Sequence, residues 1–333
     1  MTLDALPTPL APAAGAVLRT ASADVDEHCE NLGEWRLNYD QLSAGAFRGS
    51  FTQLSLPRMN VFREVTSQQV RQQGELGINS FGIALPWTPG GEVNCNGRGV
   101  SDAQVIAAFD TQVDMCTPRG FELRGLVTRP ALIAEVTAAL DIELPPWIWH
   151  QFGAIDIDEA SLARLRQLLT LVEEAIAVQP GVFDNPALCR SVEDSLLIEV
   201  TDMLPTAHLR ERIRSAEARK RTVARACDIM QAHHAEPLSI LDVCKAVGAS
   251  RRKLNYCFQE VLGTNPVNYL RAVRLNRVRR DLKLGHDQIR SIYDVAATHG
   301  FWHFSQFSLD YKRHFGELPS APLRRGRPAG PDA

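Results

Sequence analysis

Lysine is missing from the first 219 residues of this 333-residue chain, and histidine is missing between His28 and His150. Many metal-dependent enzymes built on small β folds bind their metal through imidazole ligands. The stretch between these two histidines offers none, which argues against a metalloenzyme. No pairing of a strong nucleophile with a base stands out elsewhere in the chain. We therefore expect no catalytic residues, no metal and no cofactor.

Cysteine usage and the lengths of the apolar runs restrict the compartment. The seven cysteines are widely spaced and form no CxxC pair, which is typical of a reduced, cytoplasmic protein. No apolar run reaches the ~20 residues that a membrane-spanning helix requires. The start of the chain is rich in alanine and proline and lacks a basic segment, so residues 1–30 are expected to be a flexible arm and not a signal peptide.

The charges are divided unevenly along a chain long enough for about two domains. Residues 1–218 carry a net charge of −13, whereas residues 219–327 carry +11. The near-neutral total of −3 thus hides an acidic domain joined to a basic one. A basic C-terminal third is typical of proteins that bind a polyanion such as double-stranded DNA, where contacts to phosphates dominate the affinity.

The basic third contains a repeat. The segment Ser239–Gly248 (SILDVCKAVG) is echoed by Ser291–Gly300 (SIYDVAATHG) at an offset of 52 residues. Beyond the glycine the match continues at an offset of 53, for example between Leu254 and Phe307, so the second copy accommodates one extra residue. The chain therefore carries two versions of one supersecondary unit.

Each copy predicts two helices joined by a tight turn. Ser239 and Ser291 are suited to helix N-caps, and each is followed three residues later by an aspartate in the first turn. Gly248 and Gly300 are suited to the left-handed conformation that ends a helix. Residues 267–284 predict a long helix that joins the two copies rigidly. Each copy is a helix-turn-helix, and two on one chain can enter successive major grooves about 34 Å apart.

These features resemble the DNA-binding domain of the AraC/XylS family of bacterial transcription regulators over about residues 222–325. The most specific stretches are Gly300–Phe307 (GFWHFSQF) and Asp310–Ser320 (DYKRHFGELPS). They are similar to the family's signature of Gly-Phe, then Ser and Phe on the recognition helix, an aromatic-Lys pair, Phe-Gly and Pro-Ser. The resemblance implies an effector-responsive transcription factor of a catabolic operon, usually an activator, with RNA polymerase as a further partner.

Parts of the N-terminal region resemble the ethanolamine-operon regulators within that family. The matching stretches there are Tyr39–Leu42 (YDQL), Phe62–Glu64 (FRE) and Asn79–Phe81 (NSF), and Ser250–Leu254 (SRRKL) adds to them in the basic third. The resemblance thus covers most of the chain. After the arm over residues 1–30 that the composition predicts, we expect an effector-sensing and dimerisation domain over 31–215 and a DNA-binding domain over 220–325.

The resemblance places three residues of the first recognition helix against bases: Arg252, Asn255 and Tyr256. Arginine can bind guanine through two hydrogen bonds in the major groove, and asparagine can bind adenine in the same way. Two basic neighbours, Arg251 and Lys253, are predicted to contact phosphates, which sets the register on DNA and not the sequence. For any one of these residues, a solvated role without a DNA contact is the alternative.

The corresponding base-facing positions of the second recognition helix are Phe304, Ser305 and Gln306, with His303 beside them. Phenylalanine cannot donate or accept a hydrogen bond, so Phe304 either contacts thymine methyl groups or packs within the protein. Direct reading of bases is therefore expected to be weaker in the second unit. Phosphate contacts are predicted here for Lys312 and Arg313.

Residues 45–130 show short alternating runs, such as Phe81-x-Ile83-x-Leu85, separated by turns rich in glycine, proline and asparagine. This pattern predicts a small antiparallel sandwich or barrel. The family resemblance implies a cupin-like jelly roll. The expected fold class is α+β, with a cupin-like antiparallel β domain and a helical hairpin followed by an all-α domain with two helix-turn-helix units.

The β domain is interpreted as a pocket for a small-molecule effector or as an interaction surface. Arg63, Glu64 and Trp87 are possible lining residues, with packing in the core or at the surface as the alternative for each. Two functions remain open. The first is an effector-controlled, DNA-binding regulator, and the second is a cupin-like enzyme or sensor fused to a nucleic-acid-binding tail. The missing histidines favour the first.

A seam of apolar residues at spacings of three and four follows the β region: Leu162, Leu165, Leu169, Val172 and Ile176. Such spacing is typical of a short coiled coil and predicts a homodimer. The alternative is that the seam packs inside its own domain. Residues 186–204 repeat the apolar stripe and predict the second helix of an antiparallel hairpin.

Overall fold

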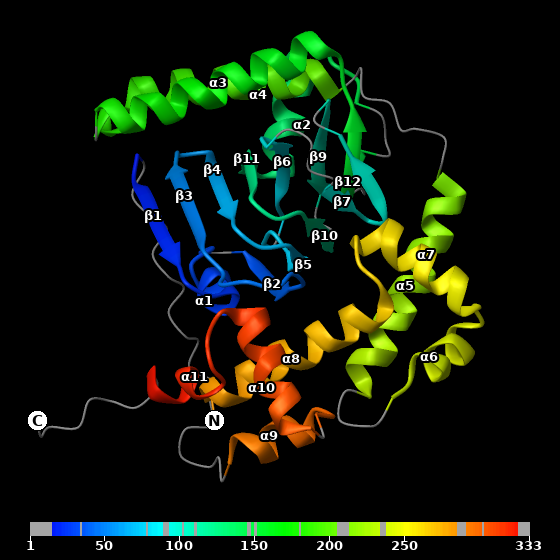
Figure 1. The fold of residues 1–333 in the computed structure, drawn as a ribbon. Coiled ribbons are helices and arrows are strands. Elements are labelled where there is room, and N and C mark those ends of the chain that lie inside the picture. Colours follow the sequence, from blue (N-terminus) through cyan, green and yellow to red (C-terminus); the bar gives the residue numbers. More distant parts are fainter. Residues whose placement is uncertain are drawn as a thin grey trace, which may run out of the picture.

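The computed structural model describes residues 15–33, 35–77, 79–88, 93–101, 103–109, 112–144, 148–149, 152–179, 181–204, 213–233, 238–284, 291–301 and 303–325. Two antiparallel sheets lie at the centre of the molecule (Figure 1). A helical hairpin lies along one side of the sheets, and the C-terminal helices lie on another. The predicted division into a β domain and an all-α domain is confirmed.

Each sheet is built from antiparallel neighbours. The first sheet has the order β1 (Val17–Ser22), β3 (Gly49–Ser55), β4 (Met59–Thr66), β11 (Phe121–Thr128), β6 (Phe81–Pro86), β9 (Gln104–Phe109) and β12 (Phe152–Asp156). The second has the order β2 (Arg36–Gln41), β5 (Val70–Glu75), β10 (Val113–Thr117), β7 (Val93–Cys95) and β8 (Arg98–Val100). Side chains of both sheets share one apolar core, so the predicted sandwich is confirmed.

The expectation of a flexible arm over residues 1–30 is wrong for residues 15–30. Residues 17–22 form β1, which pairs with β3 along its whole length. The helix α1 (Val25–Glu30) follows, and the side chain of Asp24 caps it by accepting from the backbone N–H groups of Asp26 and Glu27. Tertiary pairing at the sheet edge overrides a composition rich in alanine and small polar residues. Residues 1–14 lie outside the described part of the chain.

The helical hairpin consists of α3 (Glu159–Val178) and α4 (Pro186–Met203), joined through the 3₁₀ turn η2 (Val182–Asp184). With α2 (Pro130–Ala139) it covers the outer face of the seven-stranded sheet (Figure 1). The prediction that the apolar seam forms a dimer interface is wrong, because its five residues are buried in the chain's own core. These residues are Leu162, Leu165, Leu169, Val172 and Ile176. The 3–4 spacing marks a buried face, and here the sheet and α4 bury it.

The C-terminal domain is entirely helical in its described residues. Its helices are α5 (Ile213–Ala232), α6 (Ile240–Val247), α7 (Arg251–Leu262), α8 (Pro266–Leu284), α9 (Ile292–Thr298), α10 (Phe304–Phe315) and α11 (Ser320–Arg325). None of the helices in the described segments is long and apolar enough to cross a membrane. The pairs α6–α7 and α9–α10 are the two predicted helix-turn-helix units.

Helix α8 joins the two units through its packing. Its N-terminal half, including Tyr269 and Val273, lies in the core of the first unit. Its C-terminal half, including Leu275, Val278 and Leu282, lies in the core of the second. With 19 residues and a rise of 1.5 Å per residue, α8 is about 28 Å long. The two units are thus held apart by a helix slightly shorter than the spacing of successive major grooves.

Candidate nucleic-acid interface

The first helix-turn-helix is fixed by the caps that the sequence predicts. The Ser239 hydroxyl accepts from the backbone N–H of Asp242, and the Asp242 carboxylate accepts from the backbone N–H of Ser239. Gly248 then ends α6 in the left-handed conformation, with a φ of 66°. The hydroxyl of Ser250 caps α7 by accepting from the backbone N–H of Lys253 at 3.2 Å. The end of α6 and the start of α7 are therefore both fixed by local capping interactions.

Helix α7 is divided into a buried face and an exposed face. Leu254, Cys257 and Phe258 point into the core. The predicted DNA-contacting residues all lie on the exposed face: Arg251, Arg252, Lys253, Asn255 and Tyr256. Tyr256 is 54% exposed, which is high for a side chain of its size. The exposed face of α7 thus presents arginine, asparagine and tyrosine side chains that could contact bases if the helix lay in a major groove.

The second recognition helix, α10, presents a different surface. Ser305 and Gln306 are exposed, and the Gln306 amide donates to the Asp310 carboxylate at 3.0 Å. Phe304 is 40% exposed, yet its ring lies 6.0 Å from that of Tyr293 and 5.9 Å from that of Phe307. The structure thus supports packing as one role of Phe304.

The two units also differ in how the recognition helix begins. His303 occupies the N-cap of α10, and its side chain makes no capping hydrogen bond. Lys312 and Arg313 are exposed in the last turn of the same helix, where cations are favourable to the helix dipole. Arg313 also lines a groove of about 320 Å³ between α8, α10 and the loop after β2, together with Arg271 and Asp310. Lys312 does not line this groove.

Part of the basic charge faces the acidic sheet domain. The Arg280 guanidinium donates to the carboxylates of Asp26 and Asp40, each at 3.0 Å. The Lys283 ammonium donates to Asp24 at 2.7 Å and to Asp26 at 3.0 Å. Burial alone would raise the pKa of Asp24, but hydrogen bonds from the backbone of Glu27 and from Lys283 hold the pKa below its usual value. The opposite charges of the two domains therefore also stabilise the contact between them. The sequence pattern links the basic charge to DNA binding alone.

A buried arginine ties the sheet domain to the first unit. Arg71 on β5 is 2% exposed and donates two hydrogen bonds to the Asp114 carboxylate, both of 3.0 Å. Its Nη1 donates to the hydroxyl of Tyr269 on α8 at 2.6 Å. Nothing in the sequence marks Arg71, because one arginine within a strand pattern is common. Its role depends on a partner almost 200 residues away.

A second buried cluster ties the sheet domain to the second unit. His314 Nε2 and the Asn276 amide both donate to the backbone carbonyl of Gln41, at 3.0 Å each. The Gln41 amide returns a hydrogen bond to the His314 carbonyl at 2.7 Å. Burial lowers the pKa of His314 to about 4, so the imidazole is neutral in the folded protein at pH 7. No sequence pattern predicts this contact either.

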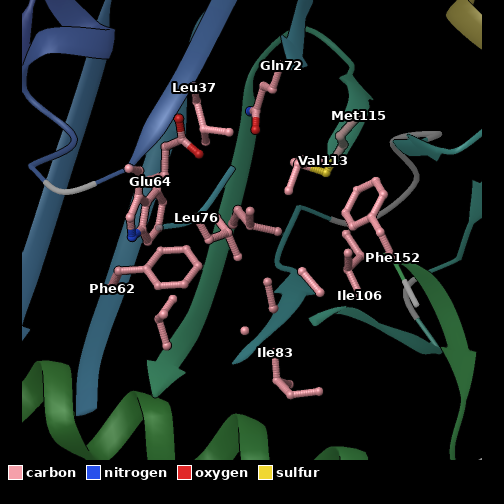
Figure 2. A pocket seen from close by; sticks show the side chains of 16 residues that line it. Leu37, Phe62, Glu64, Gln72, Leu76, Ile83, Ile106, Val113, Met115 and Phe152 are labelled. Atoms are coloured by element: carbon pink, nitrogen blue, oxygen red, sulfur yellow. The ribbon is translucent and has the colours of Figure 1, made fainter. Parts of the chain in front are cut away.

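The sheet domain contains a cavity of about 40 Å³ between its two sheets (Figure 2). Most of the wall is apolar, and it includes Leu37, Phe62, Ile83, Ile106, Met115 and Phe152. Of the three possible lining residues from the sequence, Glu64 lines the cavity. Arg63 instead pairs with Glu122, and Trp87 stacks under Arg124 with 4.0 Å between the guanidinium carbon and the ring centre. Gln72 was missed, because a glutamine in a strand carries no signal of its own.

Comparisons with known proteins place the C-terminal region. Residues 243–325 match the family model described as a helix-turn-helix domain. A probable thc operon regulatory protein from Rhodococcus erythropolis is 31% identical over 210 residues, covering 60% of this chain and 59% of that protein. The XylDLEGF operon transcriptional activator 1 from Pseudomonas putida is 40% identical over 76 residues, which are 23% of either chain. The chain thus spans less than two thirds of these relatives.

Solved structures give matches of the same kind. A transcriptional regulator with an AraC-type DNA-binding domain from Chromobacterium violaceum is 33% identical and covers 34% of this chain and 98% of that one, with a TM-score of 0.30. The AraC-like transcriptional activator CuxR is 12% identical and covers 79% of this chain and 96% of that one, with a TM-score of 0.42. The similarity to the ethanolamine-operon subgroup stays a prediction.

Proposed function

Because residues 243–325 form a helix-turn-helix domain of the AraC type with homologues among AraC/XylS-type regulators, we propose that this chain is a sequence-specific DNA-binding regulator of transcription. The observation that carries the proposal is the pair of recognition helices, α7 and α10, held apart by the ~28 Å helix α8. Each presents an exposed polar face. Two such faces on one chain suit successive major grooves of one DNA duplex.

The two recognition helices divide the work on DNA. On α7, Arg252 and Asn255 bind base edges, with Tyr256 beside them, while Arg251 and Lys253 bind phosphates. On α10, Ser305 and Gln306 reach the bases, and His303 lies at the start of the helix. Lys312 and Arg313 bind phosphates at its end. Support comes from the exposure of all these side chains.

Regulation comes from a small-molecule effector in the cavity of the sheet domain. Tyr39 on β2 connects this cavity to α8. Its hydroxyl donates to Glu64 Oε1 at 2.7 Å, and its carbonyl accepts from Arg280 Nη2 at 2.8 Å. A ligand at Glu64 would thereby alter the contact between β2 and α8. It would change DNA binding to the extent that it binds the two arrangements with different affinities.

The regulated genes form an operon, and the chain activates them in contact with RNA polymerase in the cytoplasm. Two of the relatives are named as operon regulators, and one of these as an activator, which supports this assignment. The alternative is an enzyme or sensor with a DNA-binding tail. In the described residues, no group of three or more His, Cys, Asp or Glu side chains could hold a metal ion, so no observation favours that alternative.

Selection from a random pool of DNA with the full chain tests the proposal. We expect enrichment of a bipartite sequence whose two halves lie about one helical turn apart, roughly 10 base pairs. The chain with Arg252→Ala should lose the preference at one position of one half only. If the chain binds DNA at low salt but enriches no sequence, the C-terminal domain binds DNA without sequence preference, and the proposed regulatory function is wrong.

A further inference from the structure

The cavity of the sheet domain has two buried polar side chains in a wall that is otherwise apolar apart from the indole N–H of Trp35, and these two side chains restrict the chemistry of a ligand. Glu64 on β4 and Gln72 on β5 both line it, and Figure 2 shows their carboxylate and amide ends among the apolar side chains. Both residues are almost completely buried, with exposed fractions of 3% and 2%. Buried polar groups are costly without hydrogen bonds, so each should be matched by a partner.

Glu64 is only half satisfied by the protein. Its Oε1 accepts from the Tyr39 hydroxyl at 2.7 Å and faces His28 Nε2 at 2.9 Å. Burial, followed by the charge of Glu64, raises the pKa of Tyr39 well above its usual value, so the phenol stays protonated and remains a donor. A carboxylate has about four acceptor positions on two oxygens. A ligand with a hydrogen-bond donor would complete the set at Oε2.

Gln72 requires the opposite chemistry. Its Nε2 is buried and has no hydrogen-bond partner among the described residues. An amide nitrogen carries two donors, so it requires an acceptor atom. An ammonium ion has donors only and cannot supply one, whereas a carboxylate has acceptors only and would be repelled by Glu64. Both ions would also have to leave water for an apolar cavity.

We propose that this cavity binds a compact, uncharged molecule with an apolar body and one hydroxyl or primary amide group. That group donates to Glu64 and accepts from Gln72, while the body packs against Phe62, Ile106 and Met115. This assignment rests on the proposed effector control and names the class of effector. The volume of about 40 Å³ holds roughly three or four water-sized groups, so the ligand is small. The unbranched Met115 can adapt to a somewhat longer body.

Four probes of nearly equal size test the class on the full chain: propionamide, 1-propanol, propylammonium and propionate. With ¹³C-methyl methionine, the chain gives five methyl signals, of which Met115 reports on the cavity and Met230 on the first helix-turn-helix core. We expect propionamide and 1-propanol to shift the Met115 signal in a saturable way and to leave Met230 unchanged. Propylammonium and propionate should shift neither.

Gln72→Leu should weaken the binding of propionamide about tenfold, because one buried hydrogen bond is lost. Gln73→Leu is the matched control, since the next residue on β5 points to the other face of the sheet, and it should leave the affinity unchanged. If a variant fails to fold, the four probes on the unmodified chain still test the proposed ligand class. Equal shifts with all four probes, a preference for an ion, or no shift at Met115 would overturn the assignment.

Binding of the same samples to the selected DNA separates this inference from the proposed function. If the chain binds its DNA but the uncharged probes leave Met115 unchanged, the ligand class is wrong and the regulator stands. If the probes bind as expected and no DNA sequence is preferred, the cavity is assigned correctly and the proposed function fails.

Discussion

The two helix-turn-helix units share one plan but differ in what their recognition helices expose. Helix α7 begins with a serine cap and presents two arginines, a lysine, an asparagine and a tyrosine. Helix α10 begins at His303 without a side-chain cap. It presents serine, glutamine and a phenylalanine whose ring also packs on Tyr293. From this difference we expect the first unit to supply most of the sequence preference and the second mainly to set position and register.

The sheet domain also holds the two units by different chemistry. It holds the first through the buried Arg71, which pairs with Asp114 inside the sheet domain and donates to Tyr269 on α8. It holds the second through neutral hydrogen bonds between Gln41 and His314, beside the partly exposed ion pairs of Arg280 and Lys283. Separating the domains would leave Arg71 paired with Asp114 but would break its buried hydrogen bond to Tyr269, and neither Arg71 nor Tyr269 titrates in mild acid. A neutral imidazole contact can be broken by a single proton. The Arg71–Tyr269 contact should therefore be insensitive to mild acid, whereas the Gln41–His314 contact should not be.

The largest effect is expected from Arg71→Met. This substitution leaves Asp114 without its partner and the buried Tyr269 hydroxyl without its donor. Breaking a buried pair in this way should lower the free energy of unfolding by about 3 kcal/mol, measured by urea denaturation. The exposed Arg36→Met on the neighbouring strand serves as the control and should change it by less than about 0.5 kcal/mol. Equal effects of the two substitutions would show that the Arg71 contact does not hold the domains together.

A pH titration probes the second contact. The pKa of His314 is about 4 in the folded protein and about 6.5 when unfolded, so the unfolded state binds more protons between these values. Stability from this group is therefore complete above pH 6.5 and falls as the pH drops towards 4, by up to about 3 kcal/mol. Arg279 and Asp310 are the charged groups that also act on this histidine, with Arg279 lowering its pKa further.

His314→Gln removes the titrating group while keeping a donor for the Gln41 carbonyl. Denaturation curves at pH 7 and pH 4.5 should differ less for this variant than for the unmodified chain. If the two proteins lose the same stability between these pH values, His314 is not the group responsible, and the contrast between the two contacts disappears.

Substitutions on the recognition helices sharpen the contrast between reading and positioning. Arg252→Ala should weaken binding to the selected DNA by about 1–3 kcal/mol and relax the preference at one base pair. Phe304→Ala should keep the base preference and instead lower the stability of the second unit, because it removes contacts with Tyr293 and Phe307. Fluorescence anisotropy with single-base variants of the site measures the base preference of both variants, and thermal denaturation measures the stability of the second unit. A uniform loss on all sequences for Arg252→Ala would mean that it binds only the backbone.

The smallest effects concern the caps. Ser250→Ala should destabilise the first unit by about 1 kcal/mol, since α7 loses its capping hydrogen bond. His303→Ser should stabilise the second unit by roughly 0.5–1 kcal/mol by adding the cap that α10 lacks. Thermal denaturation of the full chain gives both values. If Ser250→Ala costs no stability and His303→Ser adds none, the turn geometry, and not the missing cap, distinguishes the two units.

Local signals in the sequence predicted the local parts of this structure well. The serine caps, the turn at Gly248 and the exposed face of α7 follow from neighbours within a few residues, and they lie where they were expected. The edge strand β1 was missed because its pairing with β3 lies some 30 residues away in the chain. The seam from Leu162 to Ile176 was recognised as buried, but spacing alone does not say which surface buries it.

Contacts between the domains could not be predicted. Arg71, Gln41 and His314 gain their roles only when strands and helices from opposite ends of the chain meet. The same limit applies to the cavity. Glu64 was named among three candidates, whereas Gln72 entered only when the fold placed its unpartnered amide in the same wall.

A hydroxyl-radical footprint of the full chain on its selected DNA tests the central claim most directly. The two recognition helices should protect two patches on one face of the duplex, about one helical turn apart. Arg252→Ala with Asn255→Ala should remove one patch, and Ser305→Ala with Gln306→Ala should weaken the other. A single protected patch that neither pair of substitutions changes would contradict the account.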